Sequence, residues 1–155
     1  MKLDKIIFIF FITLLSIYPF STKAQVPPSR EIQKAQAAEE ARQFVQEYTA
    51  RFMKLELAPF MELFSERAVE NRMLPYADIR EAYRKTIEGS RSIVYSLDID
   101  SIQTYSRSAQ VAGRYKIVQA FKKGGKTVFG GDIQWDLIRE NGSLKIREVN
   151  YGRSR

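Results

Sequence analysis

Hydrophobic and polar residues alternate along the last third of the chain, from residue 111 to residue 151. In the first run, the set that shares one face consists of Val111, Gly113, Tyr115, Ile117, Gln119 and Phe121. In the second run, Phe129, Ile133, Trp135 and Leu137 share one face, and Asp132, Gln134 and Asp136 share the other. This period of two is typical of strands with one buried face. It predicts three long strands and places Trp135 in the core.

Two tight turns separate these runs. Lys123-Gly124-Gly125-Lys126 and Asn141-Gly142 carry residues that tolerate positive φ, which short hairpin loops require. Upstream, residues 93–99 alternate in the same way and predict a further strand with one polar face. A short strand is expected at residues 68–71. The long strands should therefore form an antiparallel meander.

Three stretches upstream of the meander have the three-to-four residue apolar spacing of helices. The first helix should begin after Ser29, a candidate N-cap. Its apolar stripe comprises Ala41, Phe44, Val45, Tyr48 and Phe52. The second helix covers residues 57–64. The third should begin at Asp78, with Glu81 completing a capping box, and end near Gly89. Its stripe comprises Ile79, Ala82, Tyr83, Thr86 and Ile87.

Residues 1–24 have the anatomy of a secretory signal peptide. Two lysines near the start precede an apolar run over residues 6–20, and a small-residue cleavage site ends at Ala24, before Gln25. We expect cleavage there and export to the periplasm or the medium. An uncleaved anchor is the competing interpretation, although the apolar run is short against the roughly 20 residues that span a bilayer. Contact with a membrane is expected only through this segment, before cleavage.

The remaining chain has the length of one domain. We expect a polar N-terminal segment over residues 25–32, a single domain over 33–151 and a tail over 152–155. No repeat, low-complexity tract or interdomain linker divides this region.

The composition excludes several kinds of chemistry. The chain has no histidine and no cysteine, so the commonest general base and the usual ligands of zinc and copper are absent. The sequence contains no phosphate-binding glycine loop, catalytic triad or metal-ligand cluster. We therefore expect no cofactor and no metal site. The net charge of +7 is spread along the chain, so a nucleic-acid partner is not expected.

Three amphipathic helices followed by a long meander resemble the nuclear-transport-factor-2-like (SnoaL-like) superfamily, in its small exported bacterial versions. The residues that carry the resemblance are 60–64 in the second helix and 131–146 in the last two strands. The resemblance implies an α+β fold in which three N-terminal helices pack on a curved antiparallel sheet, cone-shaped and cystatin-like. It specifies no activity, because this superfamily hosts both enzymes and non-catalytic binding domains.

A ligand pocket is predicted from polar or amphipathic side chains at positions that share a face with core residues, either in a strand or on the apolar stripe of a helix. These residues are Tyr48, Tyr83, Tyr95, Tyr115, Gln119 and Trp135. Each carries a polar atom that needs a partner when buried, whereas a closed core would use leucine or phenylalanine at several of these positions. We expect them to surround the mouth of a cavity. The alternative is that their polar groups reach the rim or bond to one another.

Glu148 is the candidate catalytic carboxylate. It continues the phase of Leu144 and Ile146 and faces inward if the last strand is regular. A bulge would instead turn Val149 and Tyr151 inward. The other strand carboxylates, such as Asp98 and Asp100, fall on the solvent face of their strand by the same alternation.

These observations lead to one expected function and two alternatives. We expect an exported, non-catalytic binding or accessory domain for a small ligand or a cell-envelope component. A small cofactor-independent lyase or isomerase that uses Glu148 or a tyrosine in the cone is the first alternative. A structural module that forms a homodimer through its sheet is the second. An inward Glu148 beside an open cavity favours the enzyme, and a filled cone with an apolar outer sheet face favours the structural module.

Overall fold

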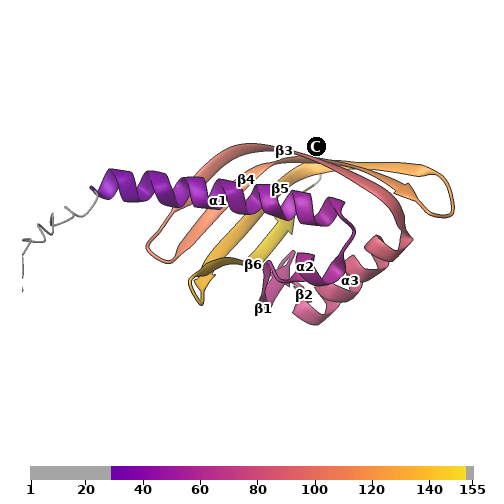
Figure 1. Cartoon of the computed structure of the whole chain (residues 1–155), viewed down its shortest axis with the longest axis horizontal. Coiled ribbons are helices and arrows are strands. Elements are labelled where there is room, and N and C mark those ends of the chain that lie inside the picture. The colour runs from indigo at the N-terminus through magenta and orange to yellow at the C-terminus, as the bar shows by residue number, and fades with distance from the viewer. Residues whose placement is uncertain (1–28, 153–155) are drawn as a thin grey trace, which may run out of the picture.

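The structure is a computed structural model, and it describes residues 29–152. The elements are α1 (Arg30–Met53), α2 (Leu57–Met61), β1 (Phe64–Glu70), β2 (Leu74–Pro75), α3 (Tyr76–Gly89), β3 (Ser90–Thr104), β4 (Ser108–Phe121), β5 (Lys126–Glu140) and β6 (Ser143–Tyr151). Figure 1 shows α1 running across one long, curved sheet, with α2 and α3 together near the C-terminal end of α1. The predicted α+β architecture is confirmed. The predicted signal peptide and its cleavage site lie outside the described residues. Among the residues described, no helix is both long enough and apolar enough to cross a membrane.

The sheet has the strand order β2-β1-β6-β5-β4-β3. Strands β3 to β6 form the predicted antiparallel meander. Strand β1 runs parallel to β6, so the sheet is mixed rather than wholly antiparallel. Strand β1 lies second from one edge of the sheet, and its pairing with β6 brings the end of β1 next to the end of β6.

Helix α1 follows the sequence pattern closely. Ser29 caps it by accepting a hydrogen bond from the backbone N–H of Ile32 at 3.4 Å. Its five predicted stripe residues are all buried. The first turns, residues 30–36, are exposed, and the N-terminal end of the helix extends away from the other helices in Figure 1. The packed half of α1 forms one wall of the interior.

The second and third helices differ from the prediction at their ends. Helix α2 stops at Met61 because the chain is already extended in β1 from Phe64. Helix α3 begins at Tyr76 without a side-chain cap, after Pro75 in extended geometry. The predicted capping box of Asp78 and Glu81 is therefore wrong.

The carboxylate of Glu81 has a different partner. It accepts two hydrogen bonds from Arg84, at 2.7 and 2.8 Å, instead of reaching back to the start of the helix. Within the predicted stripe of α3, Ile79, Tyr83 and Ile87 are buried, whereas Ala82 is exposed.

A bulge in β6 decides which of its side chains face inward. Trp135 pairs with Val149, Asp136 with Glu148, and Leu137 with Ile146, so Arg147 is an extra residue in β6. An extra residue reverses the alternation of all residues that follow it. The bulged alternative is the one that the structure adopts, and it sends Val149 inward and Glu148 outward.

The core lies between α1, α2, α3 and the concave face of the sheet. Trp135 is fully buried, as predicted. Its ring lies 5.5 Å from that of Tyr48 in an edge-to-face arrangement, and Tyr48 also packs on Phe60 at 5.1 Å. Aromatic pairs at such distances add to the stabilisation from buried area. Trp135 and Tyr48 therefore form the centre of the core.

Candidate ligand pocket

A pocket of about 310 Å³ opens between α1, α3 and the concave face of the sheet. It is lined by Tyr48, Phe52, Glu70, Ala82, Tyr83, Thr86, Tyr95, Tyr115, Ile117, Phe129 and Tyr151. A concave, mostly apolar site with a few convergent polar groups is typical of small-molecule sites, and this volume lies at the lower end of their usual range. Phe129 shares the inward face of β5 but is 45% exposed, in keeping with a place at the edge of the opening.

Three tyrosine hydroxyls from the pocket lining meet one another. The hydroxyl oxygen of Tyr48 lies 3.0 Å from that of Tyr83 and 2.7 Å from that of Tyr151, and the last two are 2.5 Å apart. They come from α1, α3 and β6, which are far apart in the sequence. The structure thus gathers three hydrogen-bonding groups on a mostly apolar wall.

Burial sets the protonation state of these phenols. It raises the pKa of Tyr48, Tyr83 and Tyr151 above the ordinary value, because a charged phenolate loses its hydration inside the protein. Burial raises the pKa of Tyr95 in the same way. All four hydroxyls are therefore neutral at physiological pH and can both donate and accept hydrogen bonds.

Glu70, the last residue of β1, brings a carboxyl group to this cluster. Burial raises its pKa above the ordinary value, and a hydrogen bond with the Tyr83 hydroxyl opposes that shift only in part. Its Oε2 atom is buried without a hydrogen-bond partner among residues 29–152. A carboxyl group in such surroundings stays protonated at a higher pH than an exposed one.

Asn71 holds the end of β1 against the end of β6. It has a positive φ of 49°, its backbone N–H donates to the carbonyl of Val149 at 2.9 Å, and its Oδ1 accepts from the backbone N–H of Tyr151 at 2.8 Å. Asparagine tolerates this left-handed geometry better than most residues. These two hydrogen bonds keep Glu70 and Tyr151 on the same side of the pocket.

The number of protons in the cluster indicates its charge. Three contacts join the three hydroxyls, and the three phenols supply one proton for each contact. An ionised Glu70 accepts the proton of Tyr83, which leaves one pair of hydroxyl oxygens without a proton between them. A neutral Glu70 leaves the ring of three hydroxyls complete.

The predicted pocket residues divide into two groups. Tyr48, Tyr83, Tyr95 and Tyr115 line the pocket. Gln119 does not, because its amide donates to the Ser90 hydroxyl at 2.9 Å, away from this site. Trp135 lies in the core beneath Tyr48, and its Nε1 has no hydrogen-bond partner among the described residues.

Glu148 is not part of the pocket. It lies on the outer face of the sheet, where its carboxylate accepts a hydrogen bond from Asn150 at 2.9 Å and lies 3.8 Å from Arg72. The carboxyl group that does reach the interior belongs to Glu70.

Sequence reasoning misses Glu70 as a site residue. Its signal is weak, because it shares the face of Ala68 in a strand that the sequence predicts only over residues 68–71. The pattern predicts an inward Tyr151 only with a bulge in the last strand. For Tyr151 the alternation is visible in the sequence, but the position of the bulge is not.

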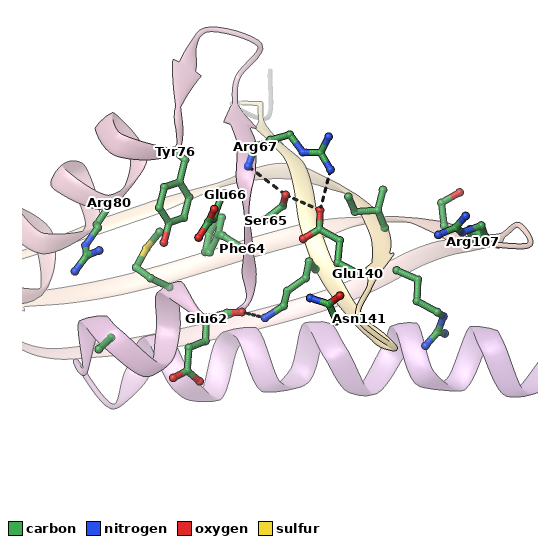
Figure 2. A pocket seen from close by; sticks show the side chains of 16 residues that line it. Glu62, Phe64, Ser65, Glu66, Arg67, Tyr76, Arg80, Arg107, Glu140 and Asn141 are labelled. Atoms are coloured by element: carbon green, nitrogen blue, oxygen red, sulfur yellow. Dashed lines mark hydrogen bonds and ion pairs between the residues drawn. The ribbon is translucent and has the colours of Figure 1, made fainter.

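A second, larger concavity of about 1220 Å³ lies outside the cone, over α2, β1 and the end of β5. Figure 2 shows its lining, with Arg67 and Glu140 near the middle and Arg80 and Arg107 at opposite ends. Ser65 donates to Glu140 at 2.8 Å, Arg67 lies 3.9 Å from the same carboxylate, and Lys145 donates to the carbonyl of Glu62. Most of its central charges thus have partners within the protein, and the groove is open and polar.

The described residues contain no group of three or more acidic side chains that could hold a metal ion. The expectation of no metal site concerns the whole chain and stays a prediction for the rest of it.

Comparison with known proteins identifies the fold alone. No protein-family model and no curated protein matches the sequence. A protein from Novosphingobium aromaticivorans, provisionally assigned as an aromatic ring hydroxylase, has a similar structure, with a TM-score of 0.69 and 14% identity over 78% of this chain and 91% of that one.

Two further structures are similar. A nuclear transport factor 2 (NTF2-like) superfamily protein from Salmonella enterica gives a TM-score of 0.67 and 16% identity over 78% of this chain and 94% of its own. A second Novosphingobium aromaticivorans protein, provisionally assigned as a scytalone dehydratase, gives a TM-score of 0.64 and 17% identity over 76% of this chain and 83% of its own. At such identities the likeness carries no activity to this chain.

Proposed function

Because the chain has the nuclear-transport-factor-2-like fold, we propose that it acts as a binding or accessory domain that holds a small ligand inside the cone. The observation that carries this proposal is the open pocket with its cluster of hydroxyls and one carboxyl group. Fold alone does not distinguish binding domains from enzymes, so the proposal rests on this site. Polar groups that converge at the end of an apolar pocket can orient a ligand of matching shape.

The structural-module alternative has less support. The cone is not filled, and the outer face of the sheet is mixed in character. A row of Val94, Val118 and Val128 crosses three strands, but Asp98, Arg114 and Asp132 form another row of paired positions on the same face. Pairing of two copies through this face stays a prediction.

A lyase or isomerase is the second candidate function. The observation that favours it is the proximity of the Glu70 carboxyl to the Tyr83 hydroxyl, since both groups can exchange protons with a bound molecule. In this candidate, Glu70 takes the role that the sequence assigned to Glu148. If the wild-type protein converts the retained ligand and Glu70→Gln does not, the result would support catalysis over binding alone.

Ala82→Phe is expected to block the pocket. Ala82 is an exposed residue of α3 that lines the pocket, so a phenyl group there can occupy the opening without entering the core. Native mass spectrometry of protein purified from its own host should show a small molecule retained by the wild type and at least about tenfold less in the variant, because a steric block removes most of the contact area.

The matched control is Ala77→Phe. Ala77 is exposed on the same helix and lies outside the pocket lining. This variant should retain the ligand like the wild type. Equal retention by Ala82→Phe and Ala77→Phe would contradict the proposed site.

Export is part of the proposal and rests on the sequence alone. The mature protein should begin at Gln25, because the charged start, apolar run and small-residue cleavage site end at Ala24. Intact-mass measurement of protein from the periplasm or medium tests this. A mass that includes Met1 or Lys2 would show that the segment is retained as an anchor. A cell-envelope component is an alternative partner for the exported domain, and no nucleic acid is proposed.

A further inference from the structure

We propose that the ligand of this pocket is a small cationic amine with an apolar or aromatic body. The inference rests on the proposed function, because it names the chemical class that the same pocket accepts. It depends on three features of the lining: its charge, its aromatic content and the missing proton partner of Glu70.

The first feature is the sign of the charge in the pocket. Among the described residues that line the pocket, Glu70 is the one side chain that can carry a charge near neutral pH, and none is a lysine or an arginine. The chain as a whole has more basic than acidic residues, 25 lysines and arginines against 18 acidic residues. The charge of the pocket wall therefore has the opposite sign to the net charge of the chain. The groups that face Glu70 are the phenols of Tyr48, Tyr83 and Tyr151. An anionic ligand would therefore meet no compensating cation among the described lining residues.

The second feature is the aromatic wall. Seven of the eleven lining residues are tyrosine or phenylalanine. Electron-rich rings attract cations, and several rings around one site form the cages in which proteins bind ammonium groups. Phe52, Ile117 and Phe129 supply apolar surface for the body of the ligand.

The third feature is the hydrogen-bonding deficit at Glu70. Its Oε2 atom is buried and has no partner among the described residues. When Glu70 ionises, it also accepts the proton of Tyr83, and the ring of three hydroxyls lacks one proton. An ammonium group restores what is missing, because it brings two or three N–H donors and a positive charge. A neutral alcohol supplies one donor and no charge.

Binding of an amine therefore couples to proton release. In the empty pocket, burial favours the neutral carboxylic acid. An ammonium ion favours the carboxylate, so Glu70 gives up its proton when the complex forms at a pH below its raised pKa in the empty pocket. The affinity for the amine should rise with pH as Glu70 ionises, until the amine itself begins to lose its proton.

The test uses three probes of similar size and different charge: 2-phenylethylamine, 2-phenylethanol and phenylacetate. Isothermal titration calorimetry should show that the wild type binds the amine at least about tenfold more tightly than the alcohol. A charge-assisted hydrogen bond is roughly twice as strong as a neutral one, and the difference in free energy corresponds to about tenfold in affinity. Phenylacetate should bind most weakly. Titrations at a series of pH values, in buffers with different heats of ionisation, should reveal proton release with the amine at pH values below the raised pKa of Glu70, and none with the alcohol.

Two variants separate the amine proposal from the proposed function. Glu70→Gln keeps the shape of the side chain and removes its charge, so it should bind amine and alcohol about equally and release no proton. Ala82→Phe should weaken all three probes. An alcohol bound as tightly as the amine by the wild type, or a tenfold amine preference kept in Glu70→Gln, would overturn the amine class.

The remaining outcomes are also decisive. If the wild type binds the alcohol as tightly as the amine, and Ala82→Phe abolishes this binding, the amine class is overturned but the proposed function is supported. Failure of the wild type to bind the amine likewise overturns the amine class, and ligand retention in native mass spectrometry then decides the proposed function separately.

Discussion

Replacing Trp135 by alanine is expected to lower the free energy of unfolding by about 3 to 5 kcal/mol. The indole is fully buried and supports Tyr48, which in turn holds the hydroxyl cluster of the pocket. The loss combines the transfer free energy of the removed atoms with the cavity left behind. Because a domain of this kind typically has about 5 to 15 kcal/mol of stability, the effect should be visible as a large shift in a urea denaturation curve.

The control for this prediction lies on the same strand. Val128 is 60% exposed on the outer face, so Val128→Ala should change the free energy of unfolding by no more than about 0.5 kcal/mol. Trp135→Phe should cost less than Trp135→Ala, since a phenyl ring fills much of the space that alanine leaves empty. An unchanged midpoint in Trp135→Ala would show that the residue is not in the core.

Stability is expected to fall as the pH rises through the raised pKa of Glu70, and this fall should be absent from Glu70→Gln. Burial raises the pKa of this carboxyl above 4.5 in the folded protein. The folded protein therefore keeps the Glu70 proton over a pH range in which the unfolded chain has released it. The resulting stability is fully present below the ordinary value and is lost as the pH passes the raised one.

The size of this effect follows from the linkage between proton binding and folding. Each tenfold difference in proton affinity between the folded and unfolded chain corresponds to at most about 1.4 kcal/mol, less what solvent screening removes at a half-buried residue. Urea denaturation of both proteins at a series of pH values measures the difference. Glu148→Gln is the matched control, because that carboxylate lies on the outer face and its removal should leave the Glu70-dependent fall in place. A constant difference between wild type and Glu70→Gln at all pH values would refute a neutral, buried Glu70.

The pocket holds polar groups that a purely structural core would avoid. Glu70 Oε2, the Tyr95 hydroxyl and Trp135 Nε1 are buried without hydrogen-bond partners among residues 29–152. Each such group costs about 1 to 3 kcal/mol of stability. Two of the three belong to residues that line the pocket. Stability given up at one place in this way is a common property of binding sites.

The sequence by itself determined the elements and most of the core. The period-two runs predicted β3, β4 and β5, and the stripe from Ala41 to Phe52 predicted the buried face of α1. Asn141-Gly142 predicted the last hairpin, where both residues have positive φ. These features are visible because burial and turn geometry act on neighbouring residues, so their record in the sequence is local.

The sequence also predicted four of the tyrosines at the pocket, since each interrupts an apolar face with a hydroxyl group. It did not separate them from Gln119 and Trp135. Both of these occupy inward positions too, but one bonds to Ser90 and the other lies beneath Tyr48. The alternation along a strand predicts which face of the sheet a side chain lies on. It does not predict whether that side chain lies at the pocket or elsewhere in the interior.

The tertiary structure alone decided which carboxyl group enters the pocket. One extra residue at Arg147 turns Glu148 outward and Tyr151 inward, and a bulge has little signature in residue types. The parallel pairing of β1 with β6 then brings Glu70 to the same end of the cone. Tyr48, Tyr83 and Tyr151 meet only because α1, α3 and β6 pack together, and contacts between residues so far apart in the chain depend on the packing of the whole fold rather than on any local pattern.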